Sequence, residues 1–183
     1  MSAPSTSLES LLADDLIDVK RELTPALLQQ LSFFRSAHLS TAALASLIQV
    51  LGHRYLSIGD NVFRQGDPST EFYVVLSGRV QFYREFLNSR ERTLGAVATG
   101  DGFGELGLLS GKPRATSARA TTACHLLFLN AEAFTSRFAV FCEERNQNII
   151  SFLQSVSVLS GLSRQTFVTL SYLVQRRSHR RGH

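Results

Sequence analysis

The stretch FGELGLLSGKPRATSARA, residues 103–120, contains one acid, Glu105, between glycine-flanked neighbours, and one arginine, Arg114, nine residues later. The residues around these two are small: Gly104, Gly107, Ser110, Gly111, Ala115, Thr116 and Ser117. Gly104 and Gly107 have no Cβ that would keep a ligand away from the main chain. A helical turn over residues 104–110 would direct unpaired N–H groups and the positive end of its dipole at an anion. The composition therefore predicts an anionic ligand lying close against the backbone.

Glu105 and Arg114 indicate what kind of anion this is. The guanidinium of Arg114 is a planar fork of donors that suits phosphate oxygens. An ionised Glu105 can only accept hydrogen bonds, so it suits a hydroxyl group such as that of a sugar. A phosphate and a hydroxyl bound side by side indicate a nucleotide. The alternative is a surface turn with an unrelated salt bridge, and it leaves the run of small residues unexplained.

This stretch resembles the phosphate-binding cassette of cyclic nucleotide-binding domains, the family of kinase regulatory subunits, cyclic-nucleotide-gated channels and the bacterial catabolite activator. The family pattern is F-G-E-[LI]-[AG]-L followed by a P-R-[AT]-[AT]-like end, and residues 103–108 and 113–116 fit it. The resemblance implies that Glu105 takes the ribose 2′-hydroxyl and that Arg114 pairs with the cyclic phosphate. The ligand-binding set that it implies is Gly104, Glu105, Leu106, Gly107, Arg114, Ala115 and Thr116.

The residue after the cassette arginine bears on the choice of base. In the family, threonine directly after this arginine accompanies a preference for cGMP. Here the position is Ala115, and Thr116 comes one residue later. The resemblance therefore favours cAMP over cGMP as the ligand. The side chain that stacks on the base usually comes from a later helix or from the next domain, and the sequence does not identify it.

The fold class follows from the hydrophobic period, which changes from 3.6 to 2 after residue 52. About eight short strands, separated by Gly-Asp turns, occupy residues 55–129 and predict an antiparallel β-roll or jelly-roll-like barrel. With flanking N- and C-terminal helices the class is α+β. The cassette interrupts the β pattern with a helical turn, and a ligand site is the natural reason for such an interruption.

The helices have recognisable ends. Thr24-Pro25 starts one helix, because proline is favoured at the first helical position. Ser40 caps a second helix that runs to Leu51, and Gly52 is expected to end it. Asn130 caps a third helix. A further amphipathic helix is expected over residues 8–22, after a disordered start.

Three segments are expected along the chain. Residues 1–23 form an N-terminal segment, partly disordered, and residues 24–152 form the cyclic nucleotide-binding domain. Residues 153–174 echo residues 28–51, including a second Leu-Ser cap, so residues 153–183 are expected to start a truncated second module with a basic tail. Tandem modules favour the kinase-regulatory type over the bacterial activator.

Composition limits the partners. The 183 residues are 44% hydrophobic and 19% charged, which are values of a globular protein. The net charge of +4 is matched by the four arginines of the tail, Arg176, Arg177, Arg180 and Arg181, so the folded part offers no case for nucleic acid. The two cysteines, Cys124 and Cys142, are expected to be free thiols in a reducing compartment. Without a secretory signal or an apolar run of ~20 residues, the expectation is a cytoplasmic protein with no membrane insertion.

Enzyme motifs do not stand out. The five histidines are scattered, without the clustered ligands that a metal site or a metal-binding cupin needs. No nucleophile elbow, Walker loop or Cys/His pair stands out either. We therefore expect a non-catalytic cyclic nucleotide sensor without metal or cofactor, which relays binding through its C-terminal helices to an effector such as a kinase catalytic subunit. The rivals are a ligand-independent scaffold of the same fold, a catabolite-activator-like DNA-binding regulator and a small cupin-like enzyme.

Overall fold

The structure is a computed structural model, and it describes residues 19–85, 91–159 and 161. The chain divides into two units, Met1–Phe138 and Ala139–His183. Most of the expected helix over residues 8–22 lies outside the described residues, which include only its end as α2 (Val19–Glu22). The expected second module over residues 153–183 also lies largely outside them, so the three segment boundaries stay predictions.

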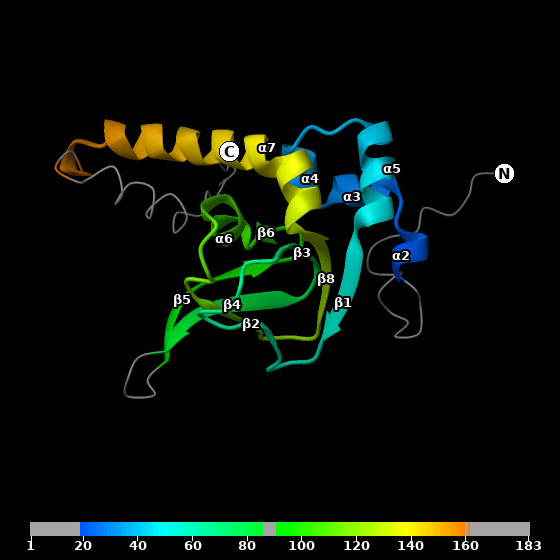
Figure 1. The fold of residues 1–183 in the computed structure, drawn as a ribbon, viewed down its shortest axis with the longest axis horizontal. Helices are drawn as coiled ribbons and strands as arrows, with labels where there is room; N and C mark the ends of the chain where they lie inside the picture. The colour runs from blue at the N-terminus through cyan, green and yellow to red at the C-terminus, as the bar shows by residue number, and fades with distance from the viewer. Residues whose placement is uncertain (1–18, 86–90, 160, 162–183) are drawn as a thin grey trace, which may run out of the picture. The chain divides into compact units, whose positions relative to one another are not determined.

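The described residues of the first unit form eight strands in two four-stranded antiparallel sheets (Figure 1). One sheet has the order β1-β8-β3-β6 and the other the order β2-β7-β4-β5. The strands are β1 (Gly52–Leu56), β2 (Asn61–Phe63), β3 (Glu71–Ser77), β4 (Arg79–Glu85), β5 (Glu91–Ala98), β6 (Gly102–Phe103), β7 (Ser117–Ala120) and β8 (Cys124–Asn130). The predicted α+β class, the strand number and the antiparallel pairing are confirmed. The barrel is not closed, and the two sheets form a sandwich.

The layer between the two sheets is the hydrophobic core. Side chains alternate along each strand, so that every second residue points into this layer. Tyr73 and Val75 of β3 meet Val80 of β4 and Ala118 of β7 there. Strand β3 is buried on both of its faces, because helices cover the side that points away from the core.

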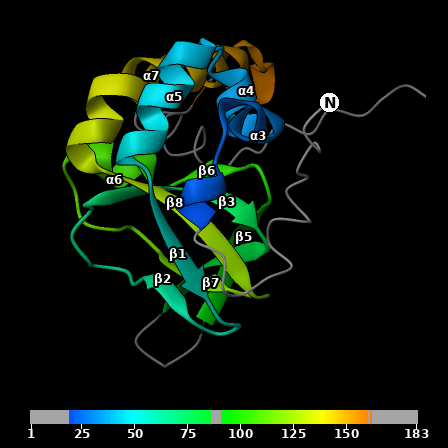
Figure 2. The same ribbon diagram turned by 90° about the vertical axis from the view of Figure 1, so that its right-hand side faces the viewer.

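That covering layer consists of α3 (Pro25–Gln30), α4 (Ser32–Ser36), α5 (Thr41–Val50) and the first residues of α7 (Ala131–Ser155). Figures 1 and 2 show these helices on the outer side of the β1-β8-β3-β6 sheet. Aromatic rings fill the contact: the ring of Phe72 lies 4.9 Å from that of Phe33 and 4.7 Å from that of Phe134, centroid to centroid. The helical layer thereby packs on β3, which pairs with β6, the strand directly before the cassette.

The predicted helix starts are confirmed. The side chain of Thr24 accepts a hydrogen bond from the Leu27 N–H, and Ser40 accepts one from the Ala43 N–H. The Asn130 side chain accepts one from the Ala133 N–H at 2.8 Å. Side-chain acceptors at these positions satisfy N–H groups that have no partner inside the helix.

The expectation for Gly52 was wrong. Helix α5 ends at Val50 with Leu51 as its C-cap, and Gly52 is the first residue of β1. A Cβ at residue 52 would lie 2.2 Å from the ring of Phe128 on the neighbouring strand β8. Glycine is required here because the Phe128 ring occupies the space, and not because a helix needs a left-handed end.

Described elements of the second unit are the later part of α7 and a 3-10 turn, Ser157–Leu159. Ile150 and Leu153 are buried there, with Ile149 and Leu159 packed against them. In the part of the chain that the structure describes, no helix has the length and apolar character needed to cross a membrane.

Candidate functional site

The cassette forms the short helix α6 (Glu105–Ser110) between β6 and β7. Gly104 precedes it at φ +93° and Gly111 follows it at φ +65°. Both values lie in the left-handed region, which glycine adopts without the steric cost that a Cβ brings. The local sequence therefore determines where this helical turn starts and ends.

Two glycines of the cassette are also needed for close packing. A Cβ at Gly107 would lie 1.9 Å from the Ser69 hydroxyl oxygen, which donates a hydrogen bond to the Lys112 carbonyl at 2.9 Å. A Cβ at Gly104 would lie 2.9 Å from Nη1 of Arg114. The missing side chain at Gly107 thus makes room for Ser69, whose hydroxyl bonds the main chain just after α6.

Arg114 is the central cation of the site, and only 5% of its surface is exposed. Its Nη1 donates to the Gly104 carbonyl at 2.8 Å, and its Nη2 donates to the Glu71 carbonyl. The guanidinium carbon lies 4.2 Å from the centre of the Phe63 ring, within cation–π range. Desolvation lowers the pKa of Arg114, but an arginine keeps its charge in proteins.

One donor of Arg114 has no partner. Among the described residues, its Nε is the buried side-chain nitrogen or oxygen that makes no hydrogen bond. Leaving a buried donor unsatisfied costs about 1–3 kcal/mol, and more for a charged group. An acceptor oxygen supplied by a ligand would remove that cost.

The other predicted site residues lie along the same turn. Glu105 is the first residue of α6; it and Leu106 are half-buried, and Glu105 has a partner within the protein. Ala115 is exposed, and its carbonyl accepts a hydrogen bond from Nη2 of Arg84 at 3.1 Å. Thr116 is half-buried. The structure thus joins Arg114 to Gly104 directly, while the ligand roles of the set remain predictions.

The sequence interpretation missed a second arginine, Arg54, which lies close to Arg114. Nη2 of Arg54 donates to both carboxylate oxygens of Glu71, at 3.0 and 3.3 Å, and the Tyr73 hydroxyl donates to the same carboxylate at 2.6 Å. Nη1 of Arg54 is 3.4 Å from that hydroxyl. Period-2 alternation places Glu71 and Tyr73 on one face of β3. The link to Arg54 depends on strand order, because β8 lies between β1 and β3.

Burial and charge change the acidity of this cluster. Desolvation, followed by the hydrogen bond to Glu71, raises the pKa of Tyr73 to about 12. Desolvation lowers the pKa of Arg54, but the charges and hydrogen bonds of Tyr73 and Glu71 outweigh it and leave the pKa above its usual value. The hydroxyl therefore remains a donor and Arg54 remains a cation throughout the physiological range.

Aromatic rings enclose this region on the core side. The Tyr73 ring lies 5.9 Å from that of Phe63 and 5.2 Å from that of Phe103, centroid to centroid. The Phe82 ring meets Phe103 at 5.6 Å, edge to face. Of these rings, Phe63 and Tyr73 lie next to the guanidinium of Arg114, and an apolar environment of this kind strengthens the interaction of a cation with an anion.

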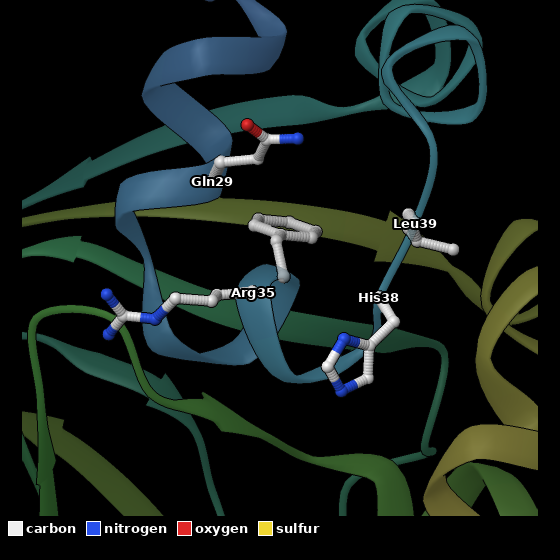
Figure 3. A pocket seen from close by; sticks show the side chains of 5 residues that line it. Gln29, Arg35, His38 and Leu39 are labelled. Carbon is white, nitrogen blue, oxygen red and sulfur yellow. The ribbon is translucent and has the colours of Figure 1, made fainter.

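A separate hollow of about 420 Å³ opens among the N-terminal helices, where Gln29, Phe34, Arg35, His38 and Leu39 line it (Figure 3). It contains none of the predicted ligand-binding residues. His38 has a φ of +51°, in the left-handed region. We place the candidate site at the cassette, because the unpartnered donor lies there.

Comparison with known proteins agrees with this geometry. A family model described as "Cyclic nucleotide-binding domain" matches residues 53–140. A cAMP-dependent protein kinase regulatory subunit of Yarrowia lipolytica is 30% identical over 129 residues, 70% of this chain and 33% of the relative. The solved regulatory domain of Toxoplasma gondii PKA with cAMP has 26% identity and a TM-score of 0.61, over 86% of this chain and 59% of that one.

A third neighbour shares only the fold. The regulatory subunit of a cAMP-independent protein kinase A from Trypanosoma cruzi, bound to guanosine, has 21% identity and a TM-score of 0.62, over 70% of this chain and 45% of that one.

Residues 53–140 form a domain of the cyclic nucleotide-binding family. The chain spans about a third of the length of the Yarrowia relative.

Proposed function

We propose that this domain binds a cyclic nucleotide, with cAMP favoured over cGMP, and acts as a non-catalytic regulatory sensor. The observation that carries the proposal is the Nε donor of Arg114, buried without a partner beside the cassette. A charged donor in that state gains most from an ionised acceptor, and a phosphodiester is one. Membership of the family makes the cyclic phosphate the natural choice.

Each cassette residue has a role in this proposal. The cyclic phosphate binds Arg114 and the main-chain N–H groups of Gly104, Gly107 and Ala115. The carboxylate of Glu105 accepts the ribose 2′-hydroxyl. Leu106 and Thr116 complete the wall around the ligand.

The preference for cAMP is supported by two observations. Ala115 follows Arg114 directly, where a threonine would accompany cGMP binding. The Yarrowia relative is a cAMP-dependent kinase subunit and the Toxoplasma domain was crystallised with cAMP. The Trypanosoma neighbour, with guanosine in the same fold, supports a role for the site residues rather than the fold in selecting the ligand.

The sensor would act through its helices. We propose that binding at the cassette biases the helix that follows Asn130 and so changes the affinity for an effector, with a kinase catalytic subunit as the proposed partner in the cytoplasm. A ligand can shift such an equilibrium only by binding one arrangement more tightly than the other. Residues 153–183 are proposed to begin a second module of the same kind.

Titration calorimetry of the purified chain with cAMP and with cGMP tests the proposal. Replacing Arg114 by lysine removes the fork and its Nε donor but keeps a charge, and Glu105→Gln removes the acceptor charge. A charge-assisted hydrogen bond contributes about 1.5–3 kcal/mol. We therefore expect each variant to bind roughly ten- to a hundredfold more weakly than the parent.

One observation favours a second candidate, a ligand-independent scaffold. Two donors of Arg114 already bind carbonyls of the protein, as those of a purely structural arginine would. If the folded parent bound neither nucleotide, the scaffold would replace the sensor. If the parent bound and Arg114→Lys bound as tightly, the assignment of Arg114 to the phosphate would be wrong. Circular dichroism and the melting temperature of each variant show whether it is folded.

A further inference from the structure

Glu71 makes two different contacts with two arginines. Its main-chain carbonyl accepts a hydrogen bond from Nη2 of Arg114, while its carboxylate accepts from Arg54 and from the Tyr73 hydroxyl. The two guanidinium carbons both lie 5.7 Å from the centre of the Tyr73 ring. One residue and one ring therefore connect the buried cassette arginine to a second, half-exposed arginine.

The location of Glu71 makes its side chain important for its carbonyl. Glu71 is the first residue of β3, where ladder pairing with Asn130 of β8 begins. A strand end is held by fewer backbone hydrogen bonds than a strand interior, so side-chain contacts fix its orientation. Arg54 lies on β1, on the far side of β8, and its contacts with both carboxylate oxygens at 3.0 and 3.3 Å anchor this strand end to the sheet.

Tyr73 adds a second constraint. Its hydroxyl donates to Glu71 at 2.6 Å, and its ring packs on Phe103, the residue directly before the cassette glycine Gly104. The Gly104 carbonyl is the other acceptor of Arg114. Tyr73 thus contacts Glu71 and Phe103. Glu71 supplies one of the two carbonyls that orient the guanidinium, and Gly104, which directly follows Phe103, supplies the other.

We propose that Arg54, Glu71 and Tyr73 are positioning residues, which hold Arg114 with its Nε donor directed at the phosphate of the ligand. This inference rests on the proposed function. When the cluster is intact, Nη1 and Nη2 each donate to a carbonyl, and the remaining guanidinium nitrogen, Nε, is oriented before the ligand arrives. When the cluster is broken, the Glu71 carbonyl moves more freely and binding must order the arginine.

The first test measures cAMP affinity in three single variants, of which Glu71→Gln and Tyr73→Phe keep the size of the side chain. Glu71→Gln keeps an acceptor for the tyrosine, Arg54→Gln removes the cation, and Tyr73→Phe removes only the hydroxyl. Each is expected to weaken binding about three- to tenfold, as for residues in contact that couple modestly. Arg54→Lys, which keeps the charge, is expected to restore part of the loss.

A second measurement separates positioning from a merely structural role. The Sp and Rp phosphorothioates of cAMP carry sulfur in place of one or the other exocyclic oxygen, so their affinity ratio reports which oxygen the arginine contacts. A fixed Arg114 distinguishes the two, and a loosened one distinguishes them less. We expect Glu71→Gln and Arg54→Gln to bring the ratio roughly threefold closer to one, in line with the loss of affinity.

Arg119→Gln is the matched control. Arg119 forms an ion pair with Glu91 at 2.7 Å and lies 4.5 Å from the Tyr83 ring. Like Arg54, it thus pairs with a glutamate beside a tyrosine ring, but away from Arg114. Its replacement should leave both the cAMP affinity and the diastereomer ratio as in the parent.

The outcomes distinguish the two proposals. A parent that binds no cyclic nucleotide overturns the proposed function and this inference together. If the parent binds and Arg114→Lys weakens binding, but folded Glu71→Gln and Arg54→Gln leave affinity and ratio unchanged, only the positioning role is wrong.

A double variant gives one further outcome. In the Arg114→Lys background no arginine is left to position, so Glu71→Gln should weaken binding by a smaller factor there than in the parent. An equal factor in both backgrounds would show that Glu71 acts on binding by another route, and the positioning role would then be wrong.

Discussion

Replacing Gly107 by alanine tests how tightly the cassette is packed. The new Cβ would lie 1.9 Å from the Ser69 hydroxyl oxygen, 2.6 Å from the Ser69 Cβ and 3.1 Å from the Lys112 carbonyl. Rotating the serine hydroxyl away would remove the first overlap but not the second. The backbone must therefore move, and the hydrogen bond from Ser69 to Lys112 at 2.9 Å is lost.

The free energy of unfolding should change by the sum of three effects. Overpacking costs about 1–3 kcal/mol, and the lost hydrogen bond costs about 1 kcal/mol. Alanine is more favourable than glycine within a helix by about 0.5–1 kcal/mol, which offsets part of this loss of stability. We expect Gly107→Ala to destabilise the domain by roughly 1–3 kcal/mol in urea denaturation.

The double variant with Ser69→Gly gives the decisive comparison. Without the serine side chain the 1.9 and 2.6 Å contacts vanish and only the 3.1 Å contact with the Lys112 carbonyl remains, so Gly107→Ala should be close to neutral, within about 1 kcal/mol, in that background. Gly95→Ala is the control, because nothing lies within 4 Å of the Cβ it would add. Equal destabilisation by Gly107→Ala in both backgrounds would refute the reasoning from the Ser69 contact.

Three further predictions concern stability. Gly52→Ala should destabilise the domain by about 1–3 kcal/mol in urea, because its Cβ would lie 2.2 Å from the Phe128 ring; the change should shrink when Phe128 is replaced by alanine. Between pH 10 and 12 the unfolded chain has lost the Tyr73 proton while the folded chain keeps it, so the free energy of unfolding should fall as pH rises. The expected fall is roughly 1–2 kcal/mol after screening by solvent, and Tyr73→Phe should make it smaller. Asn130→Ala should cost about 1 kcal/mol in thermal unfolding through the lost cap on Ala133, and an unchanged stability would contradict the capping role.

Local chemistry made several features predictable from the sequence. The helix starts at Thr24, Ser40 and Asn130 depend on neighbouring residues alone, and so does the cassette turn between Gly104 and Gly111. The same holds for the alternation of the strands. These elements are determined within a few residues of sequence, and the structure confirms them.

Features that depend on residues far apart in the chain could not be predicted. Gly52 follows a helical pattern, as glycine often does at the end of a helix, but the reason for glycine here is the ring of Phe128, which occupies the space of a Cβ. The acceptors of Arg114 are main-chain carbonyls of residues 71 and 104, and a carbonyl has no sequence signature. Whether the strands close into a barrel or separate into two sheets likewise depends on the pairing of strand edges, which composition does not reveal.

The way Arg114 is held has a practical consequence for identifying the ligand. The guanidinium reaches the carbonyls of residues 71 and 104 only after β3 and the cassette have come together, so the unfolded chain has no such site. A ligand that binds only the folded state raises its stability by RT ln(1 + [L]/Kd), about 2.7 kcal/mol at a hundred times Kd. A melting-temperature screen of nucleotides and nucleosides against the purified chain would therefore rank candidate ligands without any knowledge of the effector.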